Sequence, residues 1–193
     1  MTLCGFEIAP GEKRRVKLPV PGGEPLEAWL LCGIHPGKTL VVTAGVHGCE
    51  YVGILALKKL IETLDCAALC GQVVLLPLVN PKGFFAGVKQ LNPADGKNLN
   101  REFPGEEDGT ETQRMAWVIE KLLYPEADFL LDLHGGDWTG ILVLCFTDAL
   151  YRQMLGHPAL IQKQHIITKI GNGGQVMGNK DIRQAKAVFQ FSQ

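Results

Sequence analysis

The sequence predicts an α/β fold in which a mixed, mostly parallel sheet is flanked by helices. Two observations predict it. Short apolar, β-branched runs alternate along the chain with amphipathic segments of helical spacing. One of the runs is apolar throughout, as in a strand covered on both faces. With 193 residues, of which 46% are hydrophobic, the chain is long enough for one domain with a sizeable core.

The first predicted elements follow one another in β-α-β order. The apolar runs 26–34 and 39–46 are predicted strands, joined by the turn HPGK, whose Pro and Gly are typical of a hairpin or a tight connection. Residues 51–64 carry apolar side chains at helical spacing with Lys and Glu between them, which indicates an amphipathic helix. The run 72–80 is the strand predicted to be covered on both faces.

The second half of the chain begins with a long polar stretch. Residues 80–109 are rich in Gly and Pro and show no sustained periodicity, and loops of that length in a compact domain tend to be functional. A second amphipathic helix is predicted at 110–123, preceded by acidic residues that suit a helix start. The runs 127–138 and 141–146 are predicted strands, and the first contains His134 near its end.

The composition changes near residue 156. We predict an α/β domain at 1–156 and an atypical, weakly structured tail at 157–193. The tail is rich in Gln, Gly and Lys, shows only short apolar runs, and holds five basic residues against one acidic residue.

Composition and charge exclude several classes of partner. The net charge of -1 gives no sign of the basic patch with which proteins usually bind nucleic acids or anionic membranes, so neither partner is expected. The amino-terminal residues do not form a signal peptide, and no apolar run approaches the roughly 18 residues of a membrane span. We therefore expect a cytoplasmic protein. Six scattered cysteines are expected to be free thiols rather than a disulfide framework.

Three polar residues stand at strand ends. His47 and Glu50 lie in the turn that follows the run 39–46, and His134 follows an apolar run in the second half of the chain. Open α/β sheets collect their ligands at the carboxyl ends of strands, and zinc in hydrolases usually has three protein ligands and an open fourth position. A zinc site is one interpretation. The alternative is that each is an ordinary turn residue, since Glu at a helix start stabilises the helix dipole.

The long loop offers groups that bind an anion. Arg101 has a planar fork of donors that fits a carboxylate, and Asn98 and Asn100 add orienting hydrogen bonds. The expected partner is therefore a small-molecule carboxylate. The alternative is an exposed arginine without a specific role.

Together, these segments resemble a known family. HGCE with the helix after it, NPKGFFAGVKQLNPADGKNLNREFPG, and DLHGGD are similar, in the same order, to the succinylglutamate desuccinylase and aspartoacylase family of the zinc carboxypeptidase clan. The resemblance covers about residues 25–145. It implies a zinc-carboxypeptidase-like fold and hydrolysis of the amide in an N-acyl amino acid. It also implies that Asn100 and Arg101 bind the substrate carboxylate, and that one zinc ion is held by His47, Glu50 and His134.

Two departures from the family pattern bear on activity. Where many relatives have an Arg that stabilises the oxyanion, this chain has Lys89, which donates as a point charge without the fork. The family's catalytic Glu lies well after the third zinc ligand, and no Glu follows Glu126 here. Asp137, in the HGGD turn, is expected to orient a metal ligand instead.

These departures leave three functional hypotheses. The first is a zinc-dependent deacylase of N-acyl amino acids. The second is a metal-binding pseudoenzyme or a truncated, non-catalytic member of the family, incomplete at its carboxyl end. A blander alternative, without a function of its own, is an incomplete gene product whose exposed sheet edge would leave it marginally stable or dependent on self-association as a homo-oligomer. The third is a metallocarboxypeptidase, because the same zinc and Arg geometry accepts a peptide carboxyl terminus.

Overall fold

The computed structural model of the chain describes residues 1–135, together with the backbone of 142–146 and 165–167. Most of the predicted tail, 157–193, and the predicted ligand-orienting residue Asp137 lie outside the described residues.

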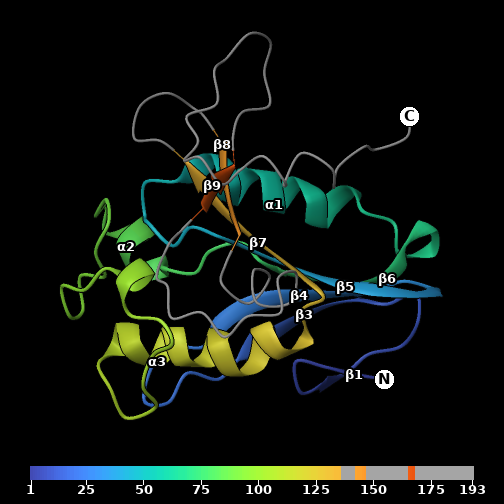
Figure 1. The fold of residues 1–193 in the computed structure, drawn as a ribbon, viewed down its shortest axis with the longest axis horizontal. Coiled ribbons are helices and arrows are strands. Elements are labelled where there is room, and N and C mark those ends of the chain that lie inside the picture. Colours follow the sequence, from blue (N-terminus) through green and yellow to red (C-terminus); the bar gives the residue numbers. More distant parts are fainter. Residues whose placement is uncertain (136–141, 147–164, 168–193) are drawn as a thin grey trace, which may run out of the picture.

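A mixed sheet of seven strands forms the middle of the molecule, in the order β3-β4-β6-β5-β7-β8-β9 (Figure 1). A separate pair, β1 (Thr2–Leu3) and β2 (Phe6–Glu7), lies near the amino terminus. The strands of the large sheet are β3 (Lys13–Leu18), β4 (Leu26–Cys32), β5 (His35–Ala44), β6 (Cys70–Leu76), β7 (Phe129–Gly135), β8 (Leu142–Phe146) and β9 (His165–Ile167).

The mixed sheet with flanking helices is confirmed, but its parallel part is smaller than predicted. Among the described strands, β5 runs parallel to β6 and to β7, and the other pairs are antiparallel. The reason lies in the connections. Helix-containing crossovers link β5 to β6 and β6 to β7, and such crossovers allow strands to run in the same direction. The pairs β3–β4 and β7–β8 are each joined by a short connection, which favours antiparallel pairing.

The prediction of a turn at HPGK is wrong, and β4 and β5 do not form a hairpin. β5 already begins at His35, and β6 lies between β4 and β5. Gly37 serves a close approach of backbones, because a Cβ there would lie 2.7 Å from the carbonyl carbon of Cys70 on the neighbouring strand. The chain turns earlier, at Gly33 and Ile34.

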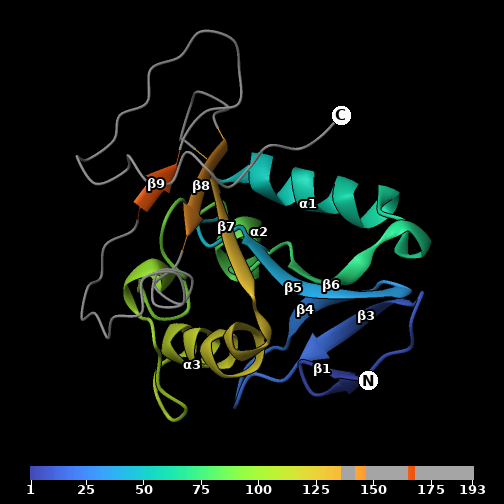
Figure 2. The ribbon, with the colours of Figure 1, turned by 45° about the vertical axis from the view of Figure 1, so that its right-hand side comes forward.

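Two helices cover opposite faces of the sheet (Figures 1 and 2). α1 (Tyr51–Thr63) matches the first predicted helix. α3 (Glu111–Val118) continues as helical turns through Glu126 and matches the second. The predicted loop 80–109 contains the short helix α2 (Pro81–Phe85) and the 3-10 turn η2 (Leu99–Arg101).

The core has two halves, one on each face of the sheet. Alternate residues of β6 point to opposite sides, so Val73 belongs to the core cluster that contains Leu57 of α1, whereas Val74 belongs to the cluster that contains Met115 of α3. The central strands are thus buried between two layers of helix, and this packing holds the ends of the strands in place. No helix of the described part is long and apolar enough to cross a membrane. None of the five cysteines whose side chains are described forms a disulfide.

Candidate metal centre

The parallel pair β5 and β7 brings two distant segments together. In the register of this pair, Thr43 lies opposite Asp132 and Ala44 opposite Leu133. Both strands end at the same edge of the sheet. The turn 46–50, which follows β5, therefore adjoins His134 on β7, although 84 residues separate Glu50 from His134.

Tight packing holds the turn in place. A Cβ on Gly48 would lie 2.5 Å from the carbonyl carbon of Gly83 in α2 and 2.5 Å from the carbonyl oxygen of Val88. Only glycine allows the turn to approach the α2 segment this closely. The packing sets the position of His47, the residue before it.

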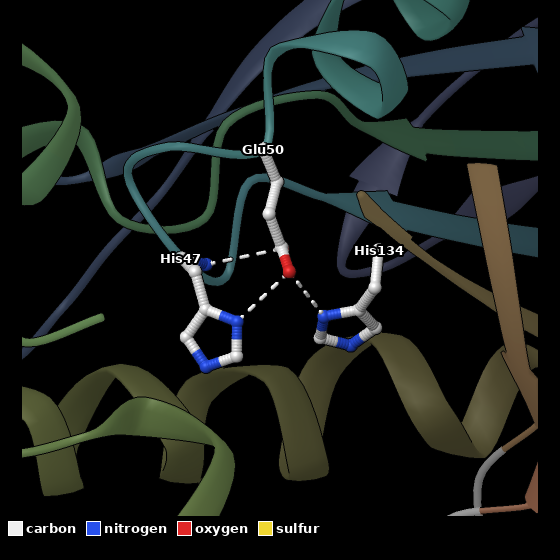
Figure 3. A group of neighbouring side chains, drawn as sticks. All are labelled: His47, Glu50 and His134. Carbon is white, nitrogen blue, oxygen red and sulfur yellow. Dashed lines mark hydrogen bonds and ion pairs between the residues drawn. The ribbon is translucent and has the colours of Figure 1, made fainter. Parts of the chain in front are cut away.

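Three side chains converge at this edge (Figure 3). Oε1 of Glu50 lies 2.9 Å from Nδ1 of His47 and 3.0 Å from Nδ1 of His134. The two imidazole rings are tilted, with centroids 5.3 Å apart. The structure thus brings together the three residues that the sequence analysis proposed as zinc ligands.

Glu50 does not act as an ordinary residue of a helix start. It is the N-cap of α1, yet its side chain makes no capping hydrogen bond, and the residue is 5% exposed. Its carboxylate instead faces the two histidines. Burial would raise the pKa of the Glu50 carboxyl, but the hydrogen bonds with His134 and His47 outweigh burial and lower that pKa.

His134 is held by a short chain of buried hydrogen bonds. Its Nε2 lies 2.7 Å from Oδ2 of Asp132, and Oδ1 of Asp132 accepts a hydrogen bond of 2.7 Å from the hydroxyl of Thr43. Burial would lower the pKa of His134, but the Asp132 and Glu50 carboxylates raise it to about 10. With Nε2 turned to Asp132, Nδ1 is the nitrogen that faces Glu50.

His47 is held by the long loop. Its Nε2 lies 3.2 Å from Oδ1 of Asn98, and its backbone N–H donates to Oε2 of Glu50 at 3.4 Å. Here again Nδ1 is the nitrogen that faces Glu50. Both histidines therefore turn Nε2 to an acceptor in the protein and Nδ1 to the same carboxylate oxygen.

This donor set suits a divalent metal ion. The three ligand atoms lie within 4.8 Å of one another. Ligands of a tetrahedral zinc ion, each about 2.0–2.1 Å from the metal, are roughly 3.3 Å apart, close to the two measured Nδ1 to Oε1 distances. Lone pairs that face one another at such distances repel, so each contact requires a positive charge between the atoms, from a proton or a metal ion. Two imidazoles and one carboxylate are also a zinc set known from hydrolases.

The residues predicted to act on the substrate, Lys89, Asn100 and Arg101, belong to the long segment between β6 and α3. Asn100 and Arg101 belong to η2, directly after Asn98, and Nη1 of the exposed Arg101 donates to the carbonyl of Asn100 at 3.2 Å. Lys89 is exposed on the loop after α2. Their roles towards a substrate stay predictions.

Sequence reasoning missed Asp132 and Thr43. A signal for Asp132 was present, since residues two apart on a strand point to the same side, and Asp132 precedes His134 by two. The position of Asp132 makes it the acceptor for this histidine, a role that the sequence analysis gave to Asp137. Thr43 could not be found without the register of β5 and β7.

Comparison with known sequences identifies relatives. A sequence model of the succinylglutamate desuccinylase/aspartoacylase catalytic domain matches residues 36–187. An N-alpha-acetyl-L-2,4-diaminobutyric acid deacetylase from Halomonas elongata is 43% identical over 103 residues, which are 53% of this chain and 30% of that protein.

Solved structures agree. An aspartoacylase family protein from Mesorhizobium loti is 35% identical with a TM-score of 0.58, over 65% of this chain and 41% of the other. The product-bound ectoine utilization protein from Ruegeria pomeroyi is 34% identical with a TM-score of 0.54, over 58% and 34%. A metallo-carboxypeptidase from Burkholderia cenocepacia is 22% identical with a TM-score of 0.52, over 67% of this chain and 38% of the other, and shares the fold. The chain thus spans less than half the length of these relatives.

Proposed function

The chain belongs to the succinylglutamate desuccinylase/aspartoacylase family, and on that premise we propose that it is a zinc-dependent hydrolase of the amide bond in N-acyl amino acids. The observation that carries the proposal is the convergence of His47, Glu50 and His134 on one point at the edge of the sheet. The deacetylase from Halomonas elongata supports the same class of substrate.

Each side chain of the site would have a separate role in the reaction. His47, Glu50 and His134 would hold one zinc ion, which when bound polarises a carbonyl and lowers the pKa of its water. Arg101 and Asn100 would bind the substrate carboxylate and thereby orient the amide. Lys89 would donate to the oxyanion as a point charge.

A second candidate function rests on a specific departure from the family pattern. Where the resemblance implies an Arg that stabilises the oxyanion, the chain has Lys89, which donates as a point charge without the planar fork. A protein that binds zinc and a carboxylate without turnover, as a pseudoenzyme, would fit this departure.

Metal analysis of the purified protein beside His47→Ala tests the proposal. We expect one equivalent of zinc in the wild type and none in the variant, with the fold of both checked by circular dichroism. Equal zinc in both would refute the metal centre.

Hydrolysis assays then separate the two functions. Nα-acetyl-L-2,4-diaminobutyrate and N-succinyl glutamate are the first substrates, beside peptides with free and with blocked carboxyl termini. Release of the acyl group supports the deacylase. Cleavage of free-ended peptides alone would instead identify a carboxypeptidase, and zinc binding without any hydrolysis would favour the pseudoenzyme.

A further inference from the structure

One oxygen atom joins the metal centre to the loop that carries Arg101. Oδ1 of Asn98 accepts a hydrogen bond of 3.0 Å from the backbone N–H of Asn100, and it also lies 3.2 Å from Nε2 of His47. Asn98 is the N-cap of η2, the turn that contains Asn100 and Arg101. The same atom therefore contacts a proposed zinc ligand and the turn proposed to bind the substrate carboxylate.

The contact with Asn100 fixes the orientation of the Asn98 amide. A backbone N–H can only donate, so the atom of Asn98 that faces it must be the oxygen and not the nitrogen. The oxygen can only accept. For the contact with His47 to be a hydrogen bond, Nε2 of His47 carries the proton and donates it, and Nδ1 is the nitrogen that faces Glu50 and the metal position.

The two donors also occupy the oxygen of Asn98. A carbonyl oxygen has two lone pairs, and here one faces the N–H of Asn100 and the other faces His47. From the sequence, Asn98 is a predicted substrate-binding residue. The oxygen is committed to contacts within the protein, so this atom has a structural part to play at the metal centre.

We propose that Asn98 is a positioning residue that couples the metal centre to the substrate-binding turn. Its oxygen holds His47 with Nδ1 directed at the metal position and, through Asn100, ties that histidine to η2. This inference rests on the proposed zinc function. With Nδ1 of His47 held at the metal position, the Asn98 oxygen would be fixed as well and the turn would be ordered; by linkage, ordering of the turn would strengthen metal binding.

Three variants test the proposal. Asn98→Ala removes the acceptor, and we expect zinc affinity to fall about 10- to 100-fold, as for other residues that orient a metal ligand. Asn98→Asp restores an acceptor oxygen and should recover most of that loss. Asn100→Ala is the matched control, because it removes a side chain of the same turn and keeps the backbone N–H that orients Asn98; its zinc affinity should equal that of the wild type.

Two measurements do not depend on activity. In ¹H–¹⁵N spectra of the zinc-free protein, recorded at a pH low enough for both ring nitrogens of His47 to carry a proton, the Nε2–H proton should be visible in the wild type and Asn98→Asp, and lost to exchange with water in Asn98→Ala. Hydrogen exchange at the Asn100 amide should slow when zinc is added to the wild type, but not when it is added to Asn98→Ala.

The outcomes separate this proposal from the zinc function. Unchanged zinc affinity and an unchanged Nε2–H signal in a folded Asn98→Ala protein would overturn it. An equal loss of affinity in Asn100→Ala would also overturn it, because the turn as a whole and not the Asn98 oxygen would then matter. If the wild type binds no zinc, the proposed function fails, and loss of the Nε2–H signal in Asn98→Ala still tests the contact on its own.

Discussion

The two halves of the candidate metal centre are built in different ways. His134 belongs to a central strand, and its partner Asp132 lies on the same strand, with Thr43 on the neighbouring one. His47 belongs to a turn, and its partner Asn98 comes from a loop 51 residues further along the chain. We refer to these as the sheet half and the loop half. Glu50 contacts both.

The difference lies in what holds each histidine. In the sheet half, ladder hydrogen bonds and a buried carboxylate fix the imidazole. In the loop half, close backbone packing at Gly48 and a neutral amide do so. A carboxylate raises the basicity of the imidazole that it contacts, whereas an amide chiefly orients it. The sheet half therefore supplies rigidity and charge, and the loop half can link the metal to a substrate.

The largest effect is expected in the sheet half. Asp132→Ala removes the buried acceptor of His134, and breaking a buried ion pair typically costs about 3–5 kcal/mol of stability. It should also weaken zinc binding about 10- to 100-fold. Urea unfolding of the zinc-free protein and zinc titration measure the two effects.

The matched control is Asp128→Ala, just before the same strand. Asp128 forms an ion pair of 2.6 Å with the exposed Lys38 and accepts a hydrogen bond of 2.8 Å from the backbone N–H of Thr39, so its loss should cost only about 1 kcal/mol. Zinc affinity should stay at the wild-type value. If both variants lost the same stability and zinc affinity, the hydrogen bonds that join Thr43, Asp132 and His134 would not be what holds the metal centre.

A smaller effect is expected in the loop half. Gly48→Ala forces a methyl group against the backbone at Gly83 and Val88, and such overpacking costs about 1–3 kcal/mol. Because His47 must move with the turn, zinc affinity should fall as well. Thermal unfolding and zinc titration check both.

Gly135→Ala is the corresponding change in the sheet half. Among described atoms, its added Cβ would come no closer than 3.7 Å, to Glu50, so stability should change by no more than about 0.5 kcal/mol. Equal tolerance of both substitutions would show that the loop half is not held by close packing.

The sheet half was easier to predict from the sequence than the loop half. Both long helices and the central strands β5, β6 and β7 follow from periodicity and apolar runs, because their burial imposes those patterns. His47, Glu50 and His134 could be proposed because strand ends mark a sheet edge. The order of the strands could not, since the insertion of β6 between β4 and β5 depends on long-range pairing. The contact between Asn98 and His47 also lay beyond reach, because spacing does not say how a loop folds back.

The smallest effect concerns how the loop half is anchored to α3. Asp95 accepts hydrogen bonds from the backbone N–H of Thr112 at 2.8 Å, from the Thr112 hydroxyl at 2.7 Å and from the backbone N–H of Lys97 at 3.1 Å. Burial would raise the pKa of Asp95, but these hydrogen bonds outweigh it and lower that pKa. Asp95→Asn should therefore cost about 1 kcal/mol at neutral pH, measured by urea unfolding.

The pH dependence of this cost has a definite sign. Because the pKa of Asp95 is lower in the folded than in the unfolded protein, its ionised form stabilises the fold above the unfolded value of about 4. That stabilisation is lost as pH falls through the folded value. The difference in unfolding free energy between wild type and Asp95→Asn should thus be constant from pH 7 to 5 and shrink below about pH 4. A difference that persists undiminished in acid would mean that the Asp95 charge does not hold the loop, and that the shape of the side chain does.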